Sequence, residues 1–144
     1  MSDIINPKFI TDLAFKKIDF NSDSHRCVLC SEYLDITEYP ETYDDVKDYE
    51  LEEGFGYETS GVEVSTSVYY DVEDNVTVYD CEDIVWNAVD GDIGPVRYAI
   101  LYNETVDNSI VYIFDFEKNK TAVNGAKFEI KIHPNGLMRA KQKT

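Results

Sequence analysis

The stretch Arg97-Tyr98-Ala99-Ile100-Leu101-Tyr102 decides the fold class of this chain, together with Ile110–Phe116 and Lys127–Ile132, which follow it closely. Apolar side chains alternate in each stretch with a period of two, the period of a β-strand. The faces predicted in this way are Tyr98, Ile100 and Tyr102; Ile110, Tyr112, Phe114 and Phe116; and Phe128, Ile130 and Ile132, opposite Lys127, Glu129 and Lys131. The residues between them are rich in Asn, Asp, Lys and Gly, as hairpin connections are. We therefore expect three consecutive strands of one antiparallel sheet.

Shorter segments upstream have the same strand-like character. They are His25–Ser31, Val62–Tyr70, Val76–Cys81 and Ile84–Ala88. Short strands separated by turn residues predict a single all-β domain over residues 1–144, an antiparallel β-sandwich or barrel of about six to eight strands. Within this domain we expect an N-terminal arm (residues 1–11) or a short helix over Phe9–Lys17, and a basic C-terminal tail (residues 137–144). Trp86 is expected to fill the core between two sheets.

The charge of the chain is large and unevenly distributed. The chain has 29 Asp and Glu against 13 Lys and Arg, and its net charge is −16. Residues 1–31 sum to 0, residues 32–92 to −19 and residues 93–144 to +3. Because nucleic acids and anionic membranes are bound through Lys and Arg, we expect neither as a partner. The acidic segment is interpreted as a solvated face, with attraction of a basic partner as the alternative.

Targeting signals are not apparent. No run approaches the roughly 20 apolar residues that cross a bilayer, and residues 1–8 lack the charged-then-apolar pattern of a signal peptide. Synthesis in a cytoplasm is therefore expected.

The cysteines and histidines are expected to be structural. Three cysteines in a chain without an export signal do not favour a disulfide framework. Cys27 and Cys30 match C-x-x-C, but a zinc site needs four ligands, and His25 and His133 are the only histidines. A redox motif begins a helix, whereas His25–Ser31 is predicted to be a strand. Buried strand cysteines are thus favoured over a metal site or a redox site.

No motif indicates catalysis. The sequence has neither a Gly-x-Ser-x-Gly elbow nor a glycine-rich phosphate loop. Four side chains fall at positions 1, 3, 5 and 12 of an EF-hand loop: Asp71, Glu73, Asn75 and Glu82. Val76, however, occupies the place of the turn glycine that such a loop needs. We predict no enzymatic activity, no cofactor and no metal, with an irregular calcium loop at Asp90 and Asp92 as the alternative.

Residues 32–53 are acidic, rich in tyrosine and interrupted by Pro40, and they predict a long surface loop with a helical turn near Tyr43–Tyr49. Tyrosine offers contact area at a low cost in entropy, and chain termini are readily ordered by docking. The arm at residues 1–11 is accordingly a candidate contact. The other predicted contact residues are Tyr39, Tyr43, Tyr49, Phe55 and Tyr57 around the loop, and Arg139 and Lys141 in the tail.

Six segments between residues 13 and 132 follow one another in a distinctive order. They are Asp19–Ser31, Tyr39–Val46, Gly54–Val62, Glu82–Trp86, Val96–Tyr102 and Val111–Phe116. In this order the chain resembles a family of small structural proteins of tailed bacteriophages and prophages. The Cys27/Cys30 pair and the acidity of residues 44–53 depart from the family pattern, and Phe128–Met138 is generic.

The resemblance implies a non-enzymatic virion protein that is assembled in the host cytoplasm. It favours an auxiliary, decoration or fibre-anchoring protein of the capsid, with the major capsid protein as partner, and many weak contacts on a symmetric lattice would then add up. A neck, connector or tail component is the alternative within the virion, and self-association into a homo-oligomer is also open. The acidity suggests an alternative of another class, a DNA mimic that inhibits a host nucleic-acid-binding protein.

Overall fold

The computed structural model describes residues 3–141 and confirms the predicted all-β class with one short helix. The elements of this part of the chain, in order, are β1 (Ile4–Ile5), α1 (Pro7–Ala14), β2 (His25–Cys30), the 3-10 turns η1 (Tyr43–Asp45) and η2 (Lys47–Tyr49), β3 (Val62–Val64), β4 (Thr66–Asp71), β5 (Val76–Cys81), β6 (Ile84–Asn87), β7 (Ile93–Asn103), β8 (Ser109–Ala122), β9 (Lys127–Ile130) and β10 (Met138–Ala140).

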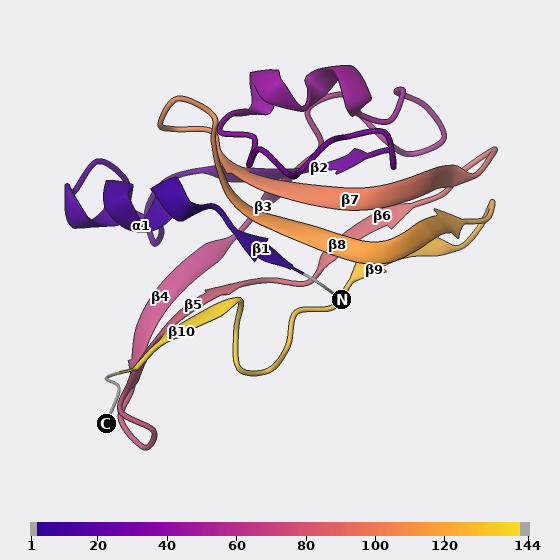
Figure 1. Ribbon diagram of the computed structural model, residues 1–144. Coiled ribbons are helices and arrows are strands. Elements are labelled where there is room, and N and C mark those ends of the chain that lie inside the picture. The colour runs from indigo at the N-terminus through magenta and orange to yellow at the C-terminus, as the bar shows by residue number, and fades with distance from the viewer. Residues whose placement is uncertain (1–2, 142–144) are drawn as a thin grey trace.

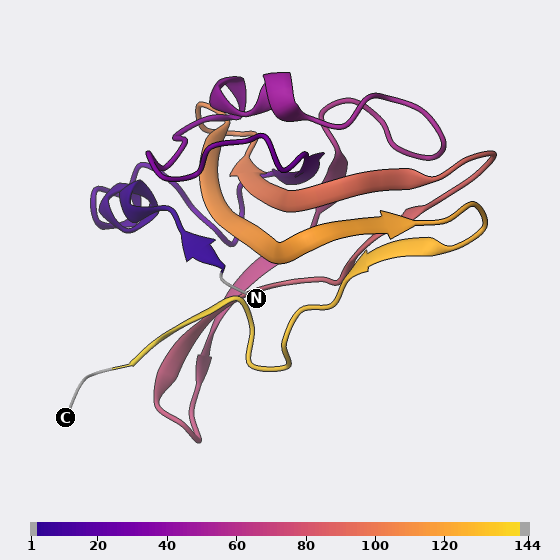
Figure 2. The ribbon, with the colours of Figure 1, turned by 45° about the vertical axis from the view of Figure 1, so that its right-hand side comes forward.

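A five-stranded antiparallel sheet with the strand order β1-β8-β7-β2-β3 forms the centre of the molecule (Figure 1). The two-stranded sheet β6-β9 lies beneath β7 and β8, which makes the fold sandwich-like. The three-stranded sheet β10-β5-β4 extends away from this body and includes the last strand of the described residues, as both ribbon views show (Figure 2).

The prediction that Lys127–Ile132 continues the sheet of the two preceding strands is wrong. β9 pairs with β6, with Trp86 opposite Phe128, in a separate sheet. The free edge of β8 is instead occupied by β1, where Ile4 pairs with Ile113. The alternation of side chains identifies a strand and its buried face, but it leaves the partner of the strand open.

The predicted face of β8 is also partly wrong. Tyr112 and Phe114 face the core between the sheets, whereas Ile110 packs on the opposite face. Leu101 pairs with Tyr112 and Tyr102 with Ile110, so Val111 is an extra residue in a β-bulge. A bulge inverts the alternation of the strand beyond it, which the sequence pattern does not reveal.

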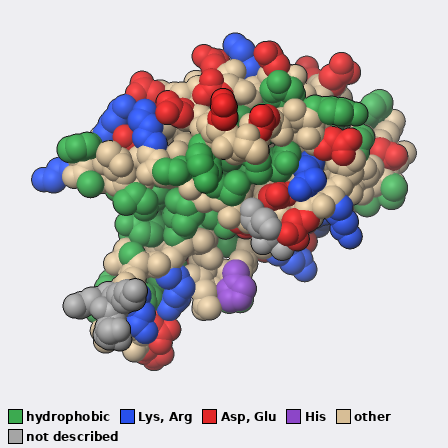
Figure 3. Space-filling model, viewed as in Figure 1, with side chains coloured by type: hydrophobic (Ala, Val, Ile, Leu, Met, Phe, Trp, Pro, Cys, Tyr) green, Lys and Arg blue, Asp and Glu red, His purple; other side chains and the backbone are tan. Residues whose placement is uncertain are grey.

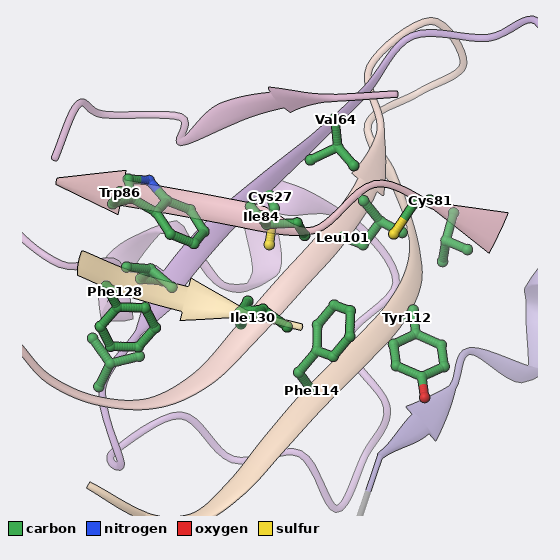
Figure 4. Packing of buried hydrophobic residues seen from close by; sticks show 14 of the residues in the cluster. Cys27, Val64, Cys81, Ile84, Trp86, Leu101, Tyr112, Phe114, Phe128 and Ile130 are labelled. Atoms are coloured by element: carbon green, nitrogen blue, oxygen red, sulfur yellow. The ribbon is translucent and has the colours of Figure 1, made fainter. Parts of the chain in front are cut away.

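The five-stranded sheet is buried on both faces. Between the sheets, Trp86 is 2% exposed and packs edge-on against Phe128 with ring centroids 5.9 Å apart (Figure 4). This confirms the expected place of the tryptophan in the core. On the other face, Val28, Cys30 and Ile100 form a second apolar cluster. Burial on both faces explains why β7 and β8 contain near-continuous apolar runs.

The predicted strand Val62–Tyr70 is divided at Ser65 into β3 and β4, which belong to different sheets. The Ser65 amide donates to the Glu82 carboxylate over 3.0 Å, where the chain passes from one sheet to the other. The strands β1 and β10 were not predicted, because two or three residues are too few to establish an alternation.

The N-terminal segment is part of the folded domain, and its helical alternative is confirmed. Asn6 caps α1 by accepting a hydrogen bond from the Lys8 amide over 3.0 Å, and Pro7 occupies the first turn, where its missing N–H costs nothing. Phe9, which is 2% exposed, anchors the helix in the core beside Phe20.

Candidate interaction surface

The connection between β2 and β3 forms a lid over the outer face of the five-stranded sheet. We call this segment, residues 31–60, the crown; its two 3-10 turns lie above β7 and β2 in Figure 1. Leu34 and Val46 point into the apolar cluster of that face and are buried. Full burial of such side chains contributes about 1.5–3 kcal/mol each, so the crown is packed as part of the domain.

Backbone hydrogen bonds fix the crown at both sides of the sheet. Beside β2, the Ser31 amide donates to the Tyr49 carbonyl and the Leu51 amide to the Leu29 carbonyl, each over 2.9 Å. Beside the start of β8, the Ile110 amide donates to the Glu41 carbonyl over 2.8 Å. The crown thus bridges strands that lie on either side of β7.

The carboxylate of Glu50 collects three donors inside the crown. It accepts hydrogen bonds from the hydroxyl of Tyr43, from the hydroxyl of Tyr57 over 2.5 Å and from the Ser60 amide over 2.9 Å. The Tyr57 oxygen in turn accepts from the Leu29 amide of β2 over 3.1 Å. Glu50 therefore ties the middle of the crown to its C-terminal end and, through Tyr57, to the sheet.

The two phenols around Glu50 remain protonated at neutral pH. Two causes raise the pKa of Tyr43 to about 12: burial, which is the larger, and the hydrogen bond to Glu50. The same two causes raise the pKa of Tyr57 above its ordinary value. A protonated phenol is a permanent donor, so this arrangement serves as a fixed clamp.

Three of the predicted contact residues in this region are exposed at the surface. Tyr39 is 50% exposed, Tyr49 39% and Phe55 55%. Tyr33, which was not predicted, is the most exposed aromatic of the crown at 77%. It carries the same signal as the others, an aromatic side chain in an acidic stretch without strand alternation. It lies within the predicted loop of residues 32–53, but the contact residues were chosen from Tyr39 onward.

Two other predicted contact residues support the crown from within. Tyr57 is buried, so the prediction that it is a contact residue is wrong. Tyr43 is half-buried and stacks on Tyr102 with ring centroids 5.0 Å apart. An aromatic residue in a loop can serve as an anchor or as a contact, and the sequence alone does not distinguish the two roles.

Phe55 is held at the tip of a tight turn. Gly54 and Tyr57 exchange backbone hydrogen bonds of 2.8 and 3.0 Å, and both central residues have positive φ, 58° for Phe55 and 102° for Gly56. A bulky residue at such a φ is unfavourable, since Asn, Asp or Gly normally occupies this place. The Phe55 ring lies against Gly91, where an added Cβ would be 2.5 Å from a ring carbon. The aromatic ring is therefore fixed in an exposed position.

The predicted contacts of the C-terminal tail are placed differently. Arg139 lies in β10 and its guanidinium is 3.0 Å from Asp74 and 3.9 Å from Asp71, on the β4–β5 hairpin. Its charge is paired within the molecule, so the structure does not support its role as a free contact. Lys141 is exposed at the end of the described chain, and the rest of the predicted tail, residues 142–144, lies outside the described residues.

The surface of the crown is strongly acidic. Residues 31–60 contain 11 Asp and Glu and a single Lys. Acidic side chains gather over the top of the molecule, where the crown lies (Figure 3). Lys47 is 3.2 Å from Asp44, so even the one ammonium group is paired within the crown.

Outside the crown, the cysteines and two of the carboxylates considered for metal binding have structural roles. The three cysteines are free and buried, and burial raises the pKa of each thiol above its ordinary value, that of Cys81 to about 12. Within residues 3–141, no three His, Cys, Asp or Glu side chains are grouped so that they could hold a metal ion. Asp71 caps the turn after β4 by accepting from the Glu73 and Asp74 amides, and Asp92 accepts from the Asn124 amide.

His25 is fully buried in β2. Its Nδ1 lies 2.9 Å from the Asp23 carbonyl oxygen, an acceptor, so Nδ1 carries the proton and donates. The other ring nitrogen, Nε2, has no hydrogen-bond partner in the part of the chain that the structure describes. Burial lowers the pKa of the imidazole, which therefore stays neutral at neutral pH.

Comparison with protein-family models, with characterised proteins and with solved structures found no match to this chain. Over residues 3–141, no helix has the length and apolar character needed to span a bilayer. The crown, with its fixed backbone and its exposed aromatic side chains among carboxylates, is therefore the candidate functional site.

Proposed function

We propose that this chain is a non-enzymatic structural protein of a tailed-bacteriophage particle, where it docks on the capsid as a decoration or fibre-anchoring protein. The observation that carries the proposal is the construction of the crown. A long acidic segment is fastened by Glu50, Leu34 and Val46, and it still leaves Tyr33, Tyr39 and Phe55 exposed. The phage setting is supported by the resemblance of the order of segments in the sequence to that of small phage structural proteins.

A fixed crown suits docking for an energetic reason. Side chains that are ordered before binding lose little entropy on binding, and aromatic rings contribute most of the energy at protein interfaces. The carboxylates around the rings favour a partner with a basic rim and an apolar centre. On a symmetric shell, even weak contacts of this kind would add up to stable attachment.

The proposal is tested by incorporation into particles. Tyr33→Ser combined with Tyr39→Ser should lower the amount of the protein in purified particles at least tenfold, as quantified by mass spectrometry against the major capsid protein. Tyr69→Ser is the matched control, because Tyr69 is 45% exposed on β4, outside the crown, and this variant should be incorporated normally.

Other outcomes would favour the alternative functions. Recovery with the neck or tail after particles are separated would identify a connector or tail component. Absence of the wild-type protein from particles would contradict a structural role. In that case, stoichiometric capture of a host DNA-binding protein, released at high salt, would favour the DNA mimic.

A further inference from the structure

A hollow with an excess of basic side chains, unlike the acidic crown, lies between β8 and β9. It has a volume of about 440 Å³ and is lined by Phe116, Lys120, Lys127, Glu129, Ile130 and Lys131. We call it the lysine groove. It places three ammonium groups and one carboxylate around an apolar floor, in a chain whose net charge is −16. Basic side chains are visible over β8 and β9 at the lower right of Figure 3.

The floor of the groove is rigid. The Lys120 ammonium lies 5.1 Å from the centre of the Phe116 ring and 4.8 Å from that of Phe128, and it donates to the Glu129 carbonyl over 2.8 Å. Lys127 and Lys131 are exposed at the rim, and among residues 3–141 only Lys131 of the two approaches a carboxylate, at 3.9 Å from Glu129. The two rim lysines are thus available to an acidic partner.

The groove and the crown lie on opposite faces of β8. Asn119 donates to Glu32 of the crown over 3.0 Å, whereas Lys120 lies over Phe116 and Phe128. Successive residues of a strand point to opposite faces, which accounts for this division. One copy therefore presents its acidic surface and its basic groove to different neighbours.

We propose that the crown of one copy docks in the lysine groove of the next, so that copies associate head to tail. The crown contains a hollow of about 330 Å³ lined by Asp35, Glu38, Tyr39, Pro40, Glu41 and Asp45. Its carboxylates complement the lysines, and the exposed ring of Tyr39 complements the apolar floor formed by Phe116 and Ile130. The second copy is the occupant because both halves of this complementarity belong to the same chain.

Head-to-tail contacts build a ring or an open chain, not a closed pair, because each copy uses two different surfaces. The net charge of −16 repels whole molecules from one another. At about 0.15 M salt the Debye length is near 8 Å, which damps that repulsion while ion pairs in contact persist. At about 1 M salt, where it is near 3 Å, these pairs weaken as well. Association should therefore be strongest at intermediate salt.

The experiment is sedimentation velocity of the purified chain over a concentration series at intermediate salt. The wild-type protein should form larger species as its concentration rises. Groove reversal (Lys127→Glu with Lys131→Glu) and crown reversal (Asp35→Lys with Glu38→Lys) should each weaken self-association about tenfold or more. Lys8→Glu with Lys16→Glu is the control for groove reversal, because it changes the net charge equally in α1 and just beyond its end. It should associate more strongly than the groove variant.

Mixing the two reversed variants gives the sharpest readout. The unaltered crown of one fits the unaltered groove of the other, and the two altered surfaces are again of opposite charge, so association should return in the mixture. A wild-type chain that stays monomeric at every concentration, or a mixture without rescue, would overturn the inference. It rests on the crown being an interaction surface, as in the proposed function. Because both contacts use Tyr39, one crown contacts either the capsid or the next copy, and particle incorporation is measured separately. Loss of incorporation by crown variants of a monomeric chain would therefore refute self-association alone.

Discussion

Glu50 is the residue on which the geometry of the crown depends most. Its carboxylate accepts from Tyr43, Tyr57 and the Ser60 amide, donors from the middle and the C-terminal end of the segment. A hydrogen bond to a charged group contributes more than one between neutral groups. The crown backbone around Tyr43, Tyr57 and Ser60 is thus held by a half-buried network and not by the exposed rings themselves.

We expect Glu50→Gln to lower the free energy of unfolding by about 1–3 kcal/mol, because the amide presents an N–H group to donors that need an acceptor. Urea unfolding measures the loss, and faster hydrogen exchange at the Ser60 amide would locate it in the crown. Glu52→Gln, at an exposed neighbouring position, is the control and should be nearly neutral. Equal effects of the two variants would contradict the clamp.

His25 makes stability depend on pH. Burial lowers the pKa of its imidazole, so below about pH 6.5 the unfolded chain binds a proton at this position more readily than the folded chain does. Stability should therefore fall as the pH is lowered below that value, by up to about 1.4 kcal/mol per pH unit from this one group.

The test compares urea unfolding at pH 7 and pH 5 for the wild type and His25→Phe. The carboxylates of Asp23, Glu63 and Glu82 line the same hollow as His25, so the readout is the difference between the two proteins. The variant should lose less stability on acidification, whatever its stability at pH 7. An identical pH dependence would mean that His25 does not contribute.

At the scale of single residues, the strand patterns predicted which side chains are buried, but they did not predict which residues those side chains contact. The cysteines of β2 and β5 are buried, as expected for residues of predicted strands, and Trp86 lies in the core as expected. Tyr57 was assigned to the surface because it lies in an acidic loop. Inside the domain its hydroxyl is hydrogen-bonded to Glu50 and to the Leu29 amide of β2. Contacts of this kind cannot be predicted from the spacing of residue types.

At the scale of elements, the junction between the crown and β3 requires glycine. Gly61 has a φ of 77°, and an added Cβ would lie 1.8 Å from the Cys27 carbonyl oxygen, a backbone atom. Because β2 is held on its other side by β7, that oxygen has little room to move. The close approach of β2 and β3 therefore excludes any side chain at this position.

We expect Gly61→Ala to cost about 3 kcal/mol or more or to prevent folding, since it combines strain in φ with a backbone clash. Gly125→Ala is the matched control: its φ is 88°, but no atom of the described residues lies within 4 Å of the added Cβ. Conformational strain alone should therefore lower the stability by only about 1–2 kcal/mol. Thermal unfolding of the two variants provides the measurement. Similar melting temperatures would show that the clash at Gly61 is relieved by movement of the backbone.

Individual strands were predicted better than their pairing. The ranges expected for β2, β5 and β6 agree with the structure to within a residue, because each is a short, largely apolar run bounded by polar turn residues. The pairing of β9 with β6, the division of Val62–Tyr70 at Ser65 and the bulge at Val111 were missed. All three depend on contacts between distant parts of the chain, which local periodicity does not encode.

At the scale of the whole molecule, charge is separated by face as well as by sequence. The acidic crown covers one face of the five-stranded sheet, and the lysine groove lies on the opposite side of β8. The excess of acid in residues 32–92 could be counted from the sequence. That these charges surround fixed aromatic rings could not, because this depends on which side chains fold inward.

The central claim is that the crown is the surface by which this protein is attached to a phage particle. Cryo-electron microscopy of the particle that encodes the chain tests the claim most directly. Density for the fold should lie on the capsid, in repeated copies, with Tyr33, Tyr39 and Phe55 facing a neighbouring protein and Glu50 enclosed behind them. Absence of this density, or attachment with the crown turned to solvent and in contact with nothing, would contradict the account.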